Sequence, residues 1–358
     1  MTVWRPTYAT REDVKQAMDI KFTAYMDTRV DRAIQDGAER VEGKLHRVFY
    51  NELSTRYFDW PNFQSAYPWR IWLDQNELAD VDGTVPTVTT GGVEQIAIPA
   101  ENIFWGPWNY APPYTYLELD RSTSSAFGQG NTPQRDTWIA GLYGYWTQTT
   151  PGGALAAAMS DTTSTSITVT NGIGGGVGDN IMIDTERLLV TAKQMASTGQ
   201  TQQSGLDSAL NNDVALGVSD GTAYSYGETL LLDSERLLVV DIAGDILTVI
   251  RAWDGSTIAA HSGATIYGLR QWTVTRGAFG STAATHADSA PITVNVAPGL
   301  IKDYNLAEAV VQLKREGGAF ALSQGSGAGK QTGIGDNLAD LRAEALTTYG
   351  RTARKRVV

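Results

Sequence analysis

The chain has 358 residues, a formal net charge of −11 and no cysteine. Disulfides, thiol chemistry and cysteine-based zinc sites are therefore excluded. The acidic balance argues against a protein that wraps nucleic acid, which needs clustered lysine and arginine to displace counterions. Apolar residues make up 42% and charged residues 19% of the chain, a balance that indicates a folded protein rather than a disordered one.

The N-terminal segment MTVWRPTYATREDVK lacks the apolar core of a signal peptide. No stretch of the chain approaches the ~18 consecutive apolar residues that a membrane-spanning helix needs. We expect the protein to be made and used without crossing a membrane.

Residues 10–47 predict a pair of helices. Thr10, followed by acidic residues, is typical of a capped helix start. Apolar residues then recur at the spacing of one helical face in two runs, and Asp27-Thr28 is the expected break between them. His46 follows the second run and is expected to cap its C-terminus.

Residues 58–145 change to an alternating pattern with frequent prolines, which predicts short strands separated by turns. These strands are expected near residues 58–61, 68–73, 79–81, 85–89, 94–98, 114–120 and 138–145. The pattern predicts a compact β-meander joined to the helical pair.

Two phrases in the middle of the chain occur twice. DTERLLV, in residues 184–190, recurs as DSERLLV in residues 233–239. The second phrase spans residues 248–257 and 273–282, and each copy is followed by a histidine. The order along the chain is first, first, second, second, which predicts one small β-unit inserted into another.

This nested order makes a geometric prediction. Residues 181–190 should pair near residues 272–276, across the intervening copy, rather than with residues 247–251. Residues 151–153 are predicted to be a linker into this module, and the polar residues 196–212 an exposed loop.

The first phrase carries an aspartate and a glutamate two residues apart, which lie on the same face of a strand. A metal site or the acid pair of a glycosidase is one interpretation. The interpretation that we favour is structural: each glutamate pairs with the arginine of the second phrase, Glu186 with Arg276 and Glu235 with Arg251.

No motif of catalysis or nucleotide binding is present in the sequence. With three histidines and no cysteine, a histidine-rich or thiolate metal site cannot be built within one chain, and His261 and His286 are interpreted as structural. We predict no enzyme activity, no cofactor and no metal.

Tryptophans are frequent before residue 148 and predict an aromatic core or a subunit interface, with a sugar-binding platform as the alternative. They are Trp60, Trp69, Trp72, Trp105, Trp108, Trp138 and Trp146.

The C-terminal part returns to helical composition. Asn305 is the expected cap of one helix, residues 336–349 predict a second, and the Gly/Ser-rich residues 317–335 separate them. The chain closes on a basic tail that contains Arg351, Arg354, Lys355 and Arg356.

These patterns predict an α+β fold with a helical core, which the N-terminal helix pair and the C-terminal helices build together. A β-meander and an inserted antiparallel β-module with a nested duplication complete the fold. The predicted division is 1–150 for the helix pair and meander, 151–298 for the inserted module, and 299–358 for the helices and tail that complete the core.

Several short phrases carry a resemblance, in the order DTRVDRAI (27–34), VEGKLHR (41–47), YFDWP (57–61) and RIWLD (70–74). With the closing helices they resemble the head-to-tail connector, or adaptor, proteins of long-tailed phages. The resemblance covers roughly residues 5–146 and 300–358. Minimal members of that family lack the inserted module.

The resemblance implies a virion protein of the neck, assembled in the host cytoplasm as a ring of copies, usually twelve, under the portal protein. The ring would extend the DNA channel, let genomic DNA pass without sequence-specific binding, and dock the next neck, stopper or tail protein. It implies portal contacts by Arg351, Arg354, Lys355 and Arg356, and subunit contacts by the helix pair through Phe22, Tyr25, Arg29, Arg32 and Arg40. The alternative is a phage tail protein whose β-module binds a host glycan or receptor.

Overall fold

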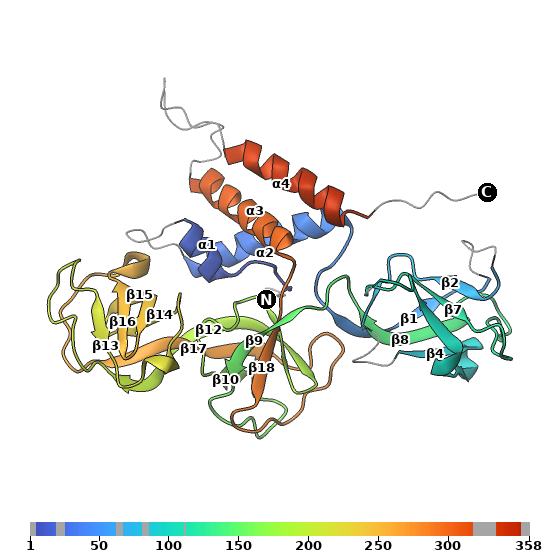
Figure 1. Ribbon diagram of the computed structural model, residues 1–358, viewed down its shortest axis with the longest axis horizontal. Coiled ribbons are helices and arrows are strands. Elements are labelled where there is room, and N and C mark those ends of the chain that lie inside the picture. The colour runs from blue at the N-terminus through green and yellow to red at the C-terminus, as the bar shows by residue number, and fades with distance from the viewer. Residues whose placement is uncertain are drawn as a thin grey trace.

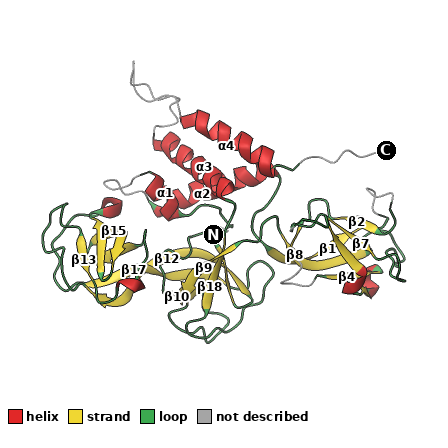
Figure 2. Ribbon diagram, viewed as in Figure 1, coloured by secondary structure: helices red, strands yellow, loops and turns green. Residues whose placement is uncertain are grey.

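The computed structural model describes residues 5–18, 26–61, 67–80, 86–110, 112–317 and 334–351. Strands account for 35% and helices for 22% of the residues, and the largest sheet has ten strands. Figures 1 and 2 show three β-rich bodies in a row, with the helices gathered on one side of that row.

The predicted helical core is therefore wrong: the fold is mostly β, and the helices form a layer beside the sheets. The helical periodicity of the chain ends is real, but it covers only the ends. Most of the strands have three to seven residues, too few to give a strong periodic signal, yet each β body buries an apolar core of its own.

Both ends of the chain build the helical layer. Its α-helices are α1 (Arg11–Ala17), α2 (Asp27–Leu45), α3 (Gly299–Gly317) and α4 (Ile334–Tyr349). Thr10 caps α1 with a complete capping box, and His46 ends α2 in the left-handed conformation, as predicted. The apolar stripe of α2 is buried against α3 and α4, with Val41, Leu45, Ile301, Tyr304 and Leu338 among its contacts. Within the described residues no helix is both long and apolar enough to cross a membrane.

Asn305 does not cap a helix, because α3 begins at Gly299 and Asn305 lies inside it. Its side-chain oxygen accepts hydrogen bonds from the backbone N–H groups of Tyr8 (3.0 Å) and Ala9 (3.1 Å). Its side-chain NH₂ donates to the carbonyl oxygen of Ile34 at 3.0 Å. One buried amide thus joins the N-terminal segment, α2 and α3.

The N-terminal β body has a five-stranded and a three-stranded sheet around one apolar core. The larger sheet contains β1 (Glu52–Phe58), β3 (Leu78–Asp80), β4 (Thr87–Thr90), β5 (Ile96–Ile98) and β8 (Thr137–Tyr143). The smaller contains β2 (Arg70–Trp72), β6 (Ile103–Gly106) and β7 (Tyr116–Leu119), and short 3-10 helices cover Gly92–Glu94 and Ala100–Asn102. Short strands separated by turns are present as predicted, but the predicted β-meander is wrong. β1 and β3 pair with β8 rather than with their neighbours along the chain, and β4 pairs with β8 as well as with β5.

The ten-stranded sheet makes up the other two β bodies. Its strands are β9 (Thr149–Ala154), β10 (Ser166–Thr168), β11 (Asn180–Ile183), β12 (Glu186–Thr201), β13 (Ala215–Gly217), β14 (Thr229–Leu232), β15 (Glu235–Ala243), β16 (Ile246–Ile250), β17 (Thr265–Thr275) and β18 (Pro291–Asn295). Two predictions are wrong here. Residues 151–153 are not a linker but part of β9, paired with β18, and residues 196–201 are not a loop but the end of β12.

The nested duplication is confirmed by the strand register. Val190 lies opposite Val274 in the β12–β17 pair, and Val239 lies opposite Val249 in the β15–β16 pair, and each pair is followed by a one-residue bulge. We call residues 149–191 with 272–296 the outer copy and residues 203–268 the inner copy. The long strands β12 and β17 run from the outer copy to the inner copy, so the insert is joined to its host by a continuous two-stranded ribbon.

Candidate functional site

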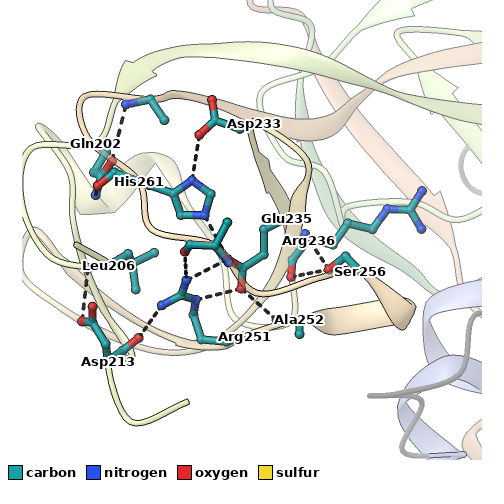
Figure 3. Close-up of polar contacts among 12 residues, drawn as sticks. Gln202, Leu206, Asp213, Asp233, Glu235, Arg236, Arg251, Ala252, Ser256 and His261 are labelled. Carbon is teal, nitrogen blue, oxygen red and sulfur yellow. Dashed lines mark hydrogen bonds and ion pairs between the residues drawn. The ribbon is translucent and has the colours of Figure 1, made fainter. Parts of the chain in front are cut away.

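The repeated phrases meet in one side-chain network in each copy. In the inner copy, Arg251 donates to both carboxylate oxygens of Glu235, each at 2.7 Å (Figure 3). The same carboxylate accepts backbone N–H groups from Ala252 and Ala259, each at 2.9 Å, and lies 2.9 Å from Nε2 of His261. Glu235 therefore fixes both ends of the segment that we call the inner loop, residues 251–261.

The other groups of this network are also occupied. Nη1 of Arg251 donates to the carbonyl oxygens of Ser208 (3.2 Å) and Asp213 (2.9 Å). Nδ1 of His261 lies 2.8 Å from the carboxylate of Asp233. Both ring nitrogens of His261 thus face carboxylates, and both can donate only when the imidazole is protonated.

The outer copy repeats this geometry, as predicted. Arg276 donates to Glu186 at 2.7 and 2.8 Å, and Gly277 and Ala284 donate their backbone N–H groups at 2.9 Å. His286 lies 2.8 Å from the same carboxylate. The corresponding segment, residues 276–286, is the outer loop. The predicted pairs Glu186–Arg276 and Glu235–Arg251 are confirmed.

The electrostatics of these carboxylates oppose an acid–base role. Burial by itself would raise their pKa values, but the arginine, the two backbone N–H groups and the histidine lower the pKa of Glu186 and of Glu235 to about 2. A glycosidase acid needs a raised pKa and access to substrate, whereas both side chains are 0% exposed. Their contacts are those of structural groups.

The two loops differ at their tips, where Phe279 and Asp254 occupy equivalent positions with the same φ of 52°. The carbonyl oxygen of Phe279 accepts the backbone N–H of Leu53 at 2.8 Å, and its ring lies 5.6 Å from that of Tyr50. Asp254 instead binds Nζ of Lys15, on α1, at 2.6 Å. Each loop therefore docks its copy on a different part of the chain, which sequence reasoning missed.

The arginines predicted at a subunit interface lie between helices of the same chain. Arg29 and Arg32 each form an ion pair with Glu316 of α3 at 3.0 Å, and Arg40 pairs with Glu308 at 3.4 Å. Phe22 and Tyr25 lie outside the described residues. The interface assignment stays a prediction.

Arg351, predicted to bind the portal, contacts three parts of its own chain. It donates to the carbonyl oxygens of Asp74 (2.7 Å) and His46 (3.2 Å) and forms an ion pair with Glu77 at 2.9 Å. These contacts fasten the segment after α4 to the end of α2 and to the segment between β2 and β3. Arg354, Lys355 and Arg356 lie outside the described residues.

The tryptophans do not gather into one platform. Trp60, Trp69 and Trp105 pack against the core of the N-terminal β body, whereas Trp108 is 55% exposed. In the duplicated module, both tryptophans are buried: Trp253 is 3% and Trp272 is 0% exposed.

A cavity of about 340 Å³ lies between the helical layer and the module, lined by Thr10, Glu12, Asp13, Asp179 and Lys302 among others. Burial raises the pKa of Asp179 to about 7, against the hydrogen bond from the Gly176 N–H; Asp13 and Glu12 add to the rise. No cluster of metal-ligating side chains occurs within the described ranges.

Comparison with protein-family models, with curated proteins and with solved structures finds no match to this chain.

Proposed function

We propose that this protein is a structural subunit of a phage virion, a head-to-tail connector. It forms a ring under the portal protein, extends the DNA channel and docks the next neck or tail protein. The observation that supports this function best is the architecture. The two ends of the chain build one helical layer, and three separately cored β bodies are fastened to each other and to that layer.

The side chains with chemical potential support a structural role. The repeated glutamates, arginines and histidines bind one another and hold loops in place. The loops in turn dock the module on its surroundings, through Phe279 and Asp254. Glutamates, arginines and histidines that bind one another in this way make the module rigid. A connector between head and tail needs such rigidity.

The charge supports a channel rather than a nucleic-acid binding site. With a net charge of −11 per chain, the ring that we propose would repel the DNA phosphates and let the duplex slide. The basic tail after α4 is the exception, and it remains the segment that we propose to contact the portal.

The glycan-binding alternative uses the duplicated module, whereas the predicted tryptophan platform lies before residue 148, where the tryptophans do not gather into one surface. Trp253 and Trp272 of that module are both buried and cannot stack on a sugar. The connector function therefore has the better support.

Mass photometry of the purified chain, with and without the portal protein of the same phage, tests the proposal. We expect a discrete high-mass species that corresponds to a ring, formed alone or on the portal. A monomer that stays monomeric in the presence of portal would overturn it.

Two variants separate the tail from Arg351. Deletion of residues 352–358 keeps the contacts of Arg351 with Glu77 and Asp74, and we expect it to weaken portal binding without lowering stability. Arg351→Ala is the matched control, which should lower stability and leave portal binding of the folded chain in place.

A further inference from the structure

We propose that the inner copy is a hinged arm held against α1 by an electrostatic latch, in which Asp254 at the tip of the inner loop binds Lys15. The outer copy has no such latch, because its equivalent tip residue, Phe279, docks through a backbone hydrogen bond and an aromatic contact. The two copies of one module therefore differ in how firmly they are fixed.

The duplication identifies the tip as the docking position. Glu235 and Glu186 hold the two loops by the same set of hydrogen bonds, so the loops have the same backbone shape. Ser256 and its equivalent, Ser281, each accept a backbone N–H from the opposite strand at 2.9 Å. With the scaffold the same, the side chain at the tip decides what the loop holds.

The latch is a chain of alternating charges. Nζ of Lys15 lies 2.6 Å from Asp254 and 2.8 Å from Asp27, and Arg11 binds Asp27 at 3.0 Å. Arg236 of the inner copy binds the same oxygen of Asp254 as Lys15 does. Lys15 and Asp254 are 8% and 6% exposed, so removing either leaves its partner as a largely buried, underpaired charge.

Within the described residues, charged side chains line the seam between the inner copy and the helices, and no apolar cluster spans it. The apolar cluster of the inner copy contains no residue of the helical layer, and the clusters of the helices contain none of the inner copy. A cavity of about 280 Å³ lies in the seam, lined by Arg11, Lys15, Asp27, Lys193, Arg236 and Asp254 among others. Polar interfaces between bodies of one chain permit relative motion, so the ion pairs set the position of the arm.

The ribbon that joins the copies supplies the hinge. Its strand pairing shifts register between Gln194 and Ala196 and again between Ser197 and Thr201. Bulges of this kind bend a strand and increase its local twist. The arm therefore swings about the ribbon between the copies, while each copy keeps its own core and moves as a body.

Distance measurements on the intact chain test the latch. Because the chain has no cysteine, labels can be placed at Leu210→Cys on the inner copy and Leu346→Cys on α4, which are 59% and 42% exposed. Single-molecule energy transfer between them should give one population. Asp254→Asn and Lys15→Met should each add a second population with a different transfer efficiency.

Asp241→Asn is the matched control, because Asp241 is an exposed carboxylate of the same copy that bonds only locally. It should reproduce the unsubstituted distribution. Circular dichroism checks that each variant folds, and if Asp254→Asn does not fold, Lys15→Met decides alone. Folded latch variants with the distribution of the unsubstituted chain would overturn the proposal.

Discussion

Replacing Glu235 with glutamine should destabilise the inner copy far more than replacing Asp233 with asparagine. Both carboxylates lie beside His261, at 2.9 and 2.8 Å from its ring nitrogens. They differ in what else they bind and in exposure, since Glu235 is 0% and Asp233 64% exposed. The comparison of the two variants therefore isolates the contribution of the buried Glu235–Arg251 ion pair.

The magnitude follows from the contacts. Five hydrogen-bond contacts reach the oxygens of Glu235, two of them from Arg251. Glutamine keeps one acceptor oxygen, turns an NH₂ toward donors and leaves the Arg251 charge unpaired, which costs about 3–5 kcal/mol for a buried pair. The same contacts lower the pKa of Glu235 from 4.5 to about 2, so the carboxylate stays charged at neutral pH. Asp233→Asn should cost about 1 kcal/mol or less.

Hydrogen exchange of the backbone amides in β14, β15 and β16 measures the loss of stability in the inner copy. Urea unfolding measures the free energy of unfolding of the whole chain. We expect exchange of the inner copy to accelerate in Glu235→Gln while the outer copy keeps its protection. A loss below about 1 kcal/mol in Glu235→Gln, or an equal loss in Asp233→Asn, would refute the reasoning.

Four further predictions concern pH and packing. Because the pKa values of Glu186 and Glu235 are lowered from 4.5 to about 2, their stabilisation is complete above pH 4.5 and is lost as the pH falls through about 2. Circular dichroism during acid titration should show this loss, and Glu186→Gln with Glu235→Gln should flatten it; an unchanged acid profile would contradict it. The pKa of Asp179 is raised from 3.8 to about 7, so its charged form opposes folding and stability from this group falls as the pH rises between those values. Asp179→Asn should therefore raise Tm more at pH 8 than at pH 5, and the opposite order would exclude the assignment. A Cβ on Gly106 would lie 2.2 Å from the ring of Tyr116, so Gly106→Ala should lower stability by about 1–3 kcal/mol in urea unfolding. Gly43→Ala on α2 meets nothing within 4 Å and should raise stability by about 0.5–1 kcal/mol.

The repeated phrases made the middle of the chain predictable in detail. Because two copies of one phrase must adopt one local structure, their order predicted that residues 181–190 pair near residues 272–276. Leu189 and Val190 do pair there, whereas residues 181–183 pair with residues 186–188 and 292–294. The glutamate–arginine pairs followed from the same repetition, since a charge repeated with its counter-charge indicates a structural pair. Thr10 and His46 were predicted from helix-end chemistry, which is local.

The balance between helix and sheet could not be predicted in the same way. Short strands such as β2 and β3 have three residues each and carry almost no periodic signal. Residues 196–201 are polar because much of the surface of β12 is exposed in the ribbon between the copies. Their polarity therefore predicted a loop. A strand in such a ribbon has little need of the apolar alternation by which strands are recognised.

The contacts that join the β bodies and the helical layer could not be predicted from the sequence either. The different tips of the two loops, Asp254 and Phe279, are visible in the sequence, but their partners lie far along the chain. The sequence predicted a helix cap for Asn305 and a tail residue for Arg351. Their contacts lie on several elements that only the fold brings together. Sequence patterns report local structure, and these side chains act between bodies.

Electron microscopy of the chain mixed with the portal protein tests the central claim most directly. The connector function predicts class averages with a closed ring of this protein on one face of the portal and a continuous central channel. Portal rings without added density, or added density that closes the channel or attaches as isolated copies, would contradict it.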